Sequence, residues 1–264
     1  MLSVGKNLVE SDIVLTAAHC ISEYKKNETS HFWVTRPPSS IQVRAGLHKL
    51  SSTDEPGRES RHASMFAMHP KWNFDVEACD AGAPATTCFS NDLGLIKLDK
   101  PVRFSNTIRP IGLPKRDEEI TAFKDCILAG WGYYENIVDE YGYYDPLDLI
   151  SSDELRAANI TFLTNDECAK KWNQGESAEK FNNLLCLQLK SKNDSAATSC
   201  EGDSGGPAWC TNDQGHLAVV GVVSGGDARC GGSKPSLCTK LAKFVDWIEG
   251  RIMQLSTLAL SVEP

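Results

Sequence analysis

The chain contains 264 residues, of which 41% are hydrophobic and 23% are charged. This length and composition suit a folded protein with a sizeable apolar core, and they exclude disordered and collagen-like classes. The formal net charge of −8 argues against nucleic acid as a partner, because phosphate backbones repel an acidic surface. The ten cysteines indicate disulfides and an oxidising compartment.

The first ten residues hold no apolar run long enough for a signal peptide, so the start of the chain disagrees with the compartment that the cysteines indicate. No later stretch approaches the roughly 20 apolar residues that are needed to cross a bilayer. We therefore expect neither a membrane span nor a membrane partner.

Short β-branched segments separated by Gly, Pro, Asn and Asp predict an all-β sandwich or barrel. The expected strands include residues 13–16, 41–44, 93–98, 126–128 and 217–224. Apolar residues at helical spacing predict one late helix over 243–255. Long surface loops are expected at 22–40, 72–90 and 133–153. Tyrosines and acidic residues fill the third of these loops, which argues against a packed strand there.

The chain divides into two expected halves, residues 1–115 and 116–242, followed by the helix at 243–255. Residues 110–115 form the expected linker between the halves. The acidic excess lies after residue 115, largely in the tyrosine-rich loop.

Three segments carry residue types suited to nucleophilic catalysis: LTAAHC at 15–20, NDLGLIKL at 91–98 and CEGDSGGP at 200–207. A serine hydroxyl is a weak nucleophile at neutral pH, so Ser204 needs a base. His19 can take its proton and return it, and a buried Asp92 carboxylate would hold the imidazole in the useful tautomer. The backbone N–H groups of Gly202 and Ser204 can point at one spot and stabilise an oxyanion.

The order His, Asp, Ser, with the sequence Ala-Gly-Trp-Gly at 129–132 between the last two, resembles that of the chymotrypsin-like (trypsin-family, S1) serine proteases over nearly all of residues 8–250. The resemblance implies one peptidase domain over 1–264, built as two six-stranded antiparallel β-barrels with a C-terminal helix. The first barrel would be incomplete at its N-terminal end. An α/β-hydrolase is disfavoured, because its catalytic residues run Ser, acid, His.

As a member of this family, the chain would be a serine endopeptidase that hydrolyses protein or peptide substrates through an acyl-enzyme. The resemblance further implies a secreted monomer that macromolecular protease inhibitors could bind. No cofactor is expected, and no metal cluster is apparent. Leu47 stands where relatives that bind calcium carry a glutamate. Three sequons mark possible glycosylation sites, at Asn27, Asn159 and Asn193.

The resemblance also assigns substrate-binding positions. Thr198 would form the floor of the primary specificity pocket, and Gly226 and Ser236 would belong to its walls. A neutral floor disfavours cleavage after Lys or Arg, because a buried cation without a counter-charge is costly. We expect an apolar or aromatic preference, with Ser236 narrowing the slot. Ser224 to Gly226 would pair with an extended substrate, and Gly225, where relatives usually carry tryptophan, would leave the pocket mouth less walled.

Spacing alone does not decide how ten cysteines pair. The resemblance implies three disulfides: Cys126–Cys210, Cys168–Cys186 and Cys200–Cys230. Cys79 and Cys88 share an inserted loop and most simply close on each other. Cys20 and Cys238 are left over, because Val4 occupies the position of the usual partner of Cys20. Free thiols, or a partner in a segment outside this chain, are favoured over a Cys20–Cys238 bond.

In this family a new N-terminal ammonium pairs with the aspartate before the nucleophile, which is Asp203 here. No Ile-Val-Gly-Gly-like segment precedes His19. Two interpretations follow: a truncated or wrongly started version of a secreted protease, or a natural short form with little activity. The competing function is therefore a zymogen-locked or non-catalytic homologue that acts as a binding or regulatory module, with the loop at 133–153 as its contact surface.

Overall fold

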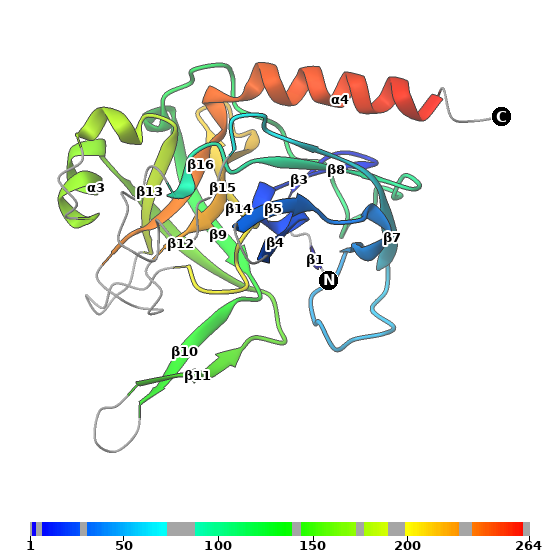
Figure 1. The fold of residues 1–264 in the computed structure, drawn as a ribbon, viewed down its shortest axis with the longest axis horizontal. Helices are drawn as coiled ribbons and strands as arrows, with labels where there is room; N and C mark the ends of the chain where they lie inside the picture. The colour runs from blue at the N-terminus through cyan, green and yellow to red at the C-terminus, as the bar shows by residue number, and fades with distance from the viewer. Residues whose placement is uncertain are drawn as a thin grey trace.

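The computed structural model describes residues 2–3, 7–26, 31–72, 88–138, 144–172, 177–189, 199–226 and 234–260. Two β-sheets of six strands each form the body of the molecule, and a long helix lies across them (Figure 1). The arrangement confirms the predicted fold class: one closed barrel, one curled sheet of the same strand number, and a C-terminal helix.

The first sheet is open. Its strand order is β1 (Leu2–Ser3), β6 (Gln42–Ala45), β7 (Glu59–Met68), β8 (Gly94–Leu98), β3 (Ile13–Thr16) and β2 (Leu8–Glu10). Both faces of β3 are buried, and the side-chain period of two sends neighbours to different cores. Val14 packs inside this sheet, whereas Ile13 and Leu15 pack in a core shared with the second half of the chain.

The second sheet closes into a six-stranded antiparallel barrel. Its order is β12 (Arg156–Leu163), β13 (Leu184–Leu189), β16 (Ser236–Lys240), β15 (Leu217–Gly225), β14 (Pro207–Asn212) and β9 (Phe123–Gly130), which pairs back with β12. The run of apolar residues in β15 is buried over almost its whole length, as a strand covered on both faces requires.

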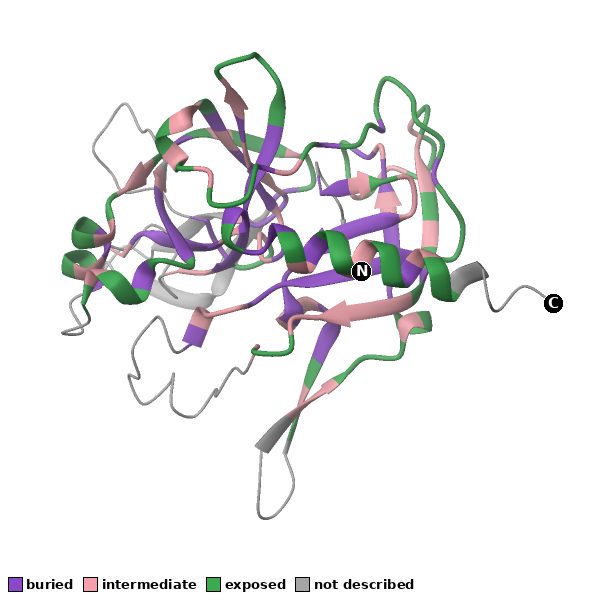
Figure 2. Ribbon diagram, turned by 90° about the horizontal axis from the view of Figure 1, so that it is seen from above, coloured by how far each residue is buried: buried purple, intermediate pink, exposed green. Residues whose placement is uncertain are grey.

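The C-terminal helix α4 spans Val245–Leu260 and follows a 3₁₀ turn, η5 (Leu241–Lys243). The prediction of a helix over 243–255 was right in kind, but the helix begins two residues later and ends five residues later. Ile248 and Leu255 bury one face of α4 in the core shared by both sheets, and the opposite face is exposed (Figure 2).

Two of the expected surface loops contain strands. β4 (Ser22–Lys26) pairs with β5 (His31–Thr35), and η2 (Pro38–Ser40) follows. β10 (Tyr133–Val138) pairs with β11 (Tyr144–Ser151) in a ribbon that extends away from the barrels (Figure 1). The loop predictions were wrong here because a hairpin satisfies its backbone groups internally, and tyrosine favours strands whatever its charged neighbours. Most of the remaining expected loop, at 72–90, lies outside the described residues.

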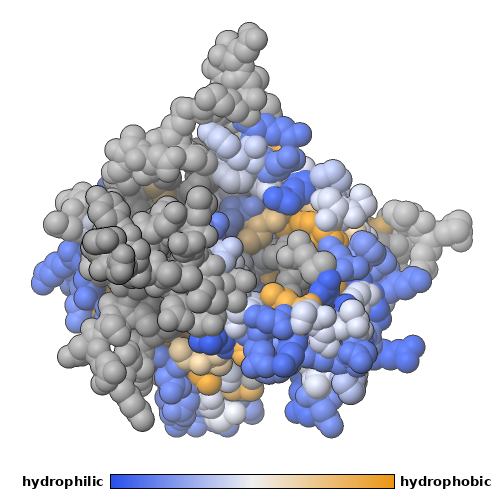
Figure 3. All heavy atoms as spheres, turned by 90° about the horizontal axis from the view of Figure 1, so that it is seen from below, coloured by the Kyte–Doolittle hydropathy of each residue, from blue (hydrophilic) through white to orange (hydrophobic). Residues whose placement is uncertain are grey.

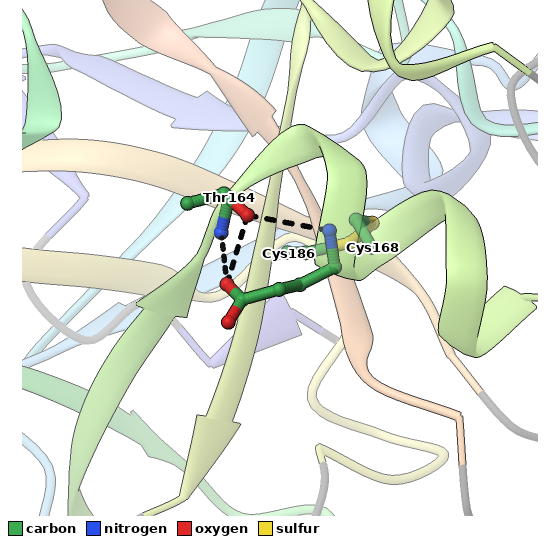
Figure 4. The surroundings of a disulfide bond; sticks show 4 residues. Thr164, Cys168 and Cys186 are labelled. Carbon is green, nitrogen blue, oxygen red and sulfur yellow. Dashed lines mark hydrogen bonds between the residues drawn. A yellow bond between two sulfur atoms is a disulfide. The ribbon is translucent and has the colours of Figure 1, made fainter.

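The shorter elements are η1 (Ala18–Ile21), η3 (Ile120–Ala122), α3 (Asn165–Trp172) and η4 (Ala178–Phe181). The start of α3 is capped reciprocally (Figure 4). The backbone N–H and the hydroxyl of Thr164 donate to a carboxylate oxygen of Glu167, over 2.8 and 2.9 Å, and the N–H of Glu167 donates to the Thr164 hydroxyl. A disulfide from Cys168 to Cys186 then ties this helix to β13.

A second disulfide joins Cys126 of β9 to Cys210 of β14. Cys200 and Cys88 are also disulfide-bonded. Their predicted partners, Cys230 and Cys79, lie outside the described residues. Among the described cysteines, Cys20 and the fully buried Cys238 are free thiols.

A cavity of about 650 Å³ lies between parts of the two sheets, with Val14 and Val43 on one side and Ala129 and Trp209 on the other. Leu47 lies in its wall, and none of the predicted catalytic residues lines it. The face shown in Figure 3 is mostly hydrophilic over the described residues, with apolar atoms gathered in limited patches. Among the described helices, none is long and apolar enough to span a bilayer.

Candidate active site

The three predicted catalytic residues come from both halves of the chain. His19 lies in η1 directly after β3, and Asp92 lies two residues before β8, which pairs with β3. Ser204 lies in the turn before β14. The sheet pairing therefore explains why residues 19 and 92 meet: both lie at the same end of neighbouring strands.

The Asp92 carboxylate holds His19 at two points. Its Oδ2 lies 2.6 Å from His19 Nδ1, and its Oδ1 accepts the backbone N–H of His19 over 3.0 Å. The Ser224 hydroxyl also donates to Oδ2, over 2.6 Å. Asp92 is only 2% exposed, so these donors replace the water that the charge has lost.

This pairing sets the pKa values of both groups. Burial raises the pKa of Asp92, but the charge of His19 and the hydrogen bonds from His19 and Ser224 outweigh it and hold the pKa below its ordinary value. Burial lowers the pKa of His19, but the charge and hydrogen bond of Asp92 outweigh it and raise that pKa well above 6.5. The pair thus stabilises an imidazolium, which general-base chemistry produces.

The other imidazole nitrogen faces a thiol. His19 Nε2 lies 3.6 Å from Cys20 Sγ, and among the described residues no hydrogen bond joins it to Ser204. The nucleophile turn nevertheless lies against the same segment. An ideal Cβ on Gly205 would lie 2.5 Å from Thr16 Oγ1 and 3.0 Å from Cys20 Sγ. Catalytic hydrogen bonds are often long in enzymes without substrate, so this geometry is compatible with a serine–histidine pair.

The turn before Ser204 has the backbone freedom that converging N–H groups need. Gly202 has φ +93°, a left-handed value that favours glycine. Asp203 points inward: its Oδ1 accepts the N–H of Gly132 over 2.9 Å and its Oδ2 that of Cys200 over 3.0 Å. Burial raises the pKa of Asp203. Within the described part of the chain, no cationic group contacts this carboxylate.

A family model described as Trypsin matches residues 3–248, which is nearly the whole chain. The chain belongs to the trypsin family. Among similar proteins, prostatic glandular kallikrein-6 of Rattus norvegicus is 30% identical over 246 residues, which cover 93% of this chain and 78% of the relative. Kallikrein 1-related peptidase b1 of Mus musculus is 29% identical, over 95% and 80% of the two chains. Kallikrein-15 of Saguinus oedipus is also 29% identical, over 92% and 79%. Membership of this serine protease family supports peptidase activity.

Around the expected specificity pocket of this trypsin-family chain, the structure brings two of the three predicted residues together. An ideal Cβ on Gly226 would lie 3.6 Å from Ser236 Cα. The fully buried Ser236 hydroxyl accepts the N–H of Ser199 over 2.7 Å and lies 2.8 Å from its hydroxyl. Thr198, the expected floor, lies outside the described residues.

Besides the contact of Cys20 with His19, two contacts of predicted site residues were not expected from the sequence. The first is the Ser224 hydroxyl on Asp92, because Ser224 was assigned only to the substrate-binding edge. The second is Phe89, whose ring lies directly on the α-carbon of Gly225 and would overlap any Cβ there. The expected opening at Gly225 is therefore filled from another loop. The one sequence signal for a role of Phe89 near the site is that it lies three residues before Asp92.

Proposed function

We propose that this chain is a serine endopeptidase in which Ser204, His19 and Asp92 form the catalytic triad. The observation that carries the proposal is the buried Asp92 carboxylate on His19 Nδ1, at 2.6 Å. That contact fixes the imidazole with Nδ1 as the donor, which leaves Nε2 as the base. The family membership of the chain supports the same reaction class.

In the proposed mechanism, His19 Nε2 takes the Ser204 proton as Oγ attacks the carbonyl carbon of a peptide substrate. The backbone N–H groups of Gly202 and Ser204 bind the resulting oxyanion. Each of these donors lowers the activation barrier by on the order of 3 kcal/mol. The imidazolium then gives its proton to the leaving amine, and an acyl-enzyme forms. Water activated by His19 hydrolyses this ester and restores the serine.

We further propose that the primary pocket, with Thr198 at its floor and Gly226 and Ser236 in its walls, accepts an apolar or aromatic side chain rather than Lys or Arg. The Ser236 hydroxyl supports this proposal because it is already engaged with Ser199 and offers no negative charge. A peptide library tests the proposal. Preferred cleavage after Lys or Arg would contradict it.

The proposed setting is extracellular: a secreted monomer that acts on proteins or peptides and is open to macromolecular inhibitors. The disulfides support an oxidising compartment. Of the three sequons, the described one is accessible, since Asn159 is exposed on β12. Asn27 and Asn193 lie outside the described residues.

Labelling with a fluorophosphonate tests the triad. The folded protein should form one covalent adduct on Ser204, which Ser204→Ala abolishes. Ser40→Ala, an exposed serine in η2, is the matched control and should label like the wild type. Asp92→Asn should slow the labelling strongly, since the imidazole loses its orienting charge.

The second candidate function is a non-catalytic or zymogen-locked homologue that works as a binding module, through the β10–β11 ribbon. Two observations favour it. The Cys20 thiol faces His19 Nε2, and among the described residues the Asp203 carboxylate accepts hydrogen bonds only from backbone N–H groups. We propose Asp203 as the acid that an N-terminal ammonium would pair with in an active form. Absence of a Ser204 adduct in the folded protein would support this second function.

A further inference from the structure

A buried asparagine in the first sheet contacts the turn that carries Ser204. Asn7 directly precedes β2 and is 3% exposed. Its side-chain amide Nδ2 donates a hydrogen bond to the backbone carbonyl of Gly205, 198 residues further along the chain. The backbone of Asn7 is itself fixed, because its carbonyl accepts the N–H of Leu15 of β3 over 2.9 Å.

The carbonyl that accepts this hydrogen bond belongs to a turn that several backbone hydrogen bonds hold in place. Gly205 is buried and has φ +76°, and its N–H donates to the carbonyl of Val223 in β15 over 2.8 Å. The N–H of Gly206 donates to the carbonyl of Asp203 over 2.9 Å, which closes the turn around Ser204. Asn7 therefore holds the carbonyl of the same peptide group whose N–H closes the turn. A buried carbonyl of this kind needs a donor.

The contact joins the two parts of the proposed triad. Asn7 and His19 both belong to the first sheet region, whereas Ser204 precedes β14 of the closed barrel. Among the described residues, the amide of Asn7 makes the hydrogen bond that links residues 203–206 to that first sheet. The relative position of serine and histidine thus depends on this bond as well as on apolar packing.

We propose that Asn7 is a positioning residue of the active site: its side-chain amide fixes the 205–206 peptide and so places the Ser204 hydroxyl relative to His19. The inference rests on the proposed function. Asn7 touches no reacting atom and acts only through the turn. Because small displacements of a nucleophile cost large factors in rate, loss of this bond should slow the chemistry by about tenfold to a hundredfold.

The test compares Asn7→Leu, which has a similar size but no donor, with Asn7→Ala, which removes the amide without adding bulk. The matched control is Ser152→Ala, which deletes another buried side-chain bond to a backbone carbonyl, that of Glu154 at 2.5 Å, away from the nucleophile turn. For each protein we would measure the rate of fluorophosphonate labelling per folded molecule, kcat and KM for a peptide substrate, and unfolding in urea.

At least one Asn7 variant should fold and show a kcat and a labelling rate at least tenfold lower, with KM within about twofold of wild type. Ser152→Ala should lose stability but keep both rates. If folded Asn7 variants label and turn over at the wild-type rate, the positioning role is wrong and the triad stands. If the wild-type protein itself forms no Ser204 adduct, the proposed function fails, and this inference fails with it.

Discussion

A single buried carboxylate, that of Asp92, joins three segments that are distant in the chain. It binds the backbone and the ring of His19, and it accepts the hydroxyl of Ser224 from the other barrel. In addition, the Thr239 hydroxyl donates to the backbone carbonyl of Asp92 over 2.9 Å. The hydrogen bonds from His19 and Ser224 to the carboxylate make its charge tolerable in the core, and those from His19 leave the imidazole little freedom to rotate.

The raised pKa of His19 predicts the pH dependence of peptidase activity. The base works only when it is neutral, so activity is lost as pH falls through a pKa that lies well above 6.5. Asp92→Asn removes the charge that raises this pKa while burial still lowers it. We expect kcat/KM to fall by a factor on the order of 10⁴ and its acid limb to move to lower pH.

The measurement is the pH profile of kcat/KM for both proteins. Asp246→Asn is the control, because Asp246 lies in an exposed ion pair with Arg116 and its loss should leave the profile unchanged. An acid limb that stays in place in Asp92→Asn would show that this carboxylate does not set the pKa of the catalytic base.

Between elements, a side chain from the first half of the chain covers the end of a strand in the second half. Phe89 lies on Gly225 at the end of β15 and packs with the apolar cluster that surrounds Trp172 of α3, at 6.1 Å between the ring centroids. The strand position that has no side chain, Gly225, is thus covered by a residue from another part of the chain. The two positions should be energetically coupled.

Gly225→Trp alone should therefore destabilise the fold by about 1–3 kcal/mol, because the new side chain needs the space of the Phe89 ring. Combined with Phe89→Ala, it should cost much less than the sum of the single changes. Urea unfolding of the four proteins of this cycle measures the coupling. Gly250→Trp in α4, where an ideal Cβ meets nothing within 4 Å, should instead be additive with Phe89→Ala.

Cys126–Cys210 and Cys168–Cys186, the disulfides whose two ends both lie among the described residues, cross-link loops of different length. Cys126–Cys210 spans 84 residues, and Cys168–Cys186 spans 18. By chain entropy, replacing the first pair with alanine should cost about 4–5 kcal/mol and replacing the second about 3 kcal/mol. Urea unfolding of the two double variants gives the comparison. A larger loss for the shorter loop would contradict the entropic account.

At the scale of the whole molecule, one core belongs to both halves of the chain. Ile13 and Leu95 of the first sheet, Val219 of the barrel and Ile248 of α4 are all buried in it. The terminal helix therefore stabilises the association of the two halves, and with it the junction at which His19 and Ser204 lie. Loss of the helix packing should therefore lower the free energy of unfolding of both halves together.

Ile248→Ala tests this arrangement, because Ile248 is fully buried on the inner face of α4. We expect it to lower the free energy of unfolding by about 2–4 kcal/mol in a single cooperative transition. Met253→Ala, at a side chain that is 66% exposed, should change it by less than about 0.5 kcal/mol. Separate unfolding of the two halves would argue against a shared core.

Much of the fold could be predicted from local sequence. The β-branched run at 13–16 forms β3 with the predicted bounds, and the apolar run at 217–224 forms β15 with one more residue. The ribbon at 133–151 was missed because its strands pair with each other and not with the barrels, so no apolar alternation marks them. The prediction ended the last helix at the buried Leu255, whereas α4 continues to Leu260.

Residue types and spacing in short segments were enough to identify the family and the strand-rich architecture of this protein. They also predict the three segments that supply the proposed triad of His19, Asp92 and Ser204. The contacts of Cys20 with His19, of Phe89 with Gly225 and of Asn7 with Gly205 were decided only by the tertiary structure. The last two of these contacts join residues that are far apart in the chain and depend on how the two halves pack, which local patterns do not encode, whereas the first depends on the local conformation of η1.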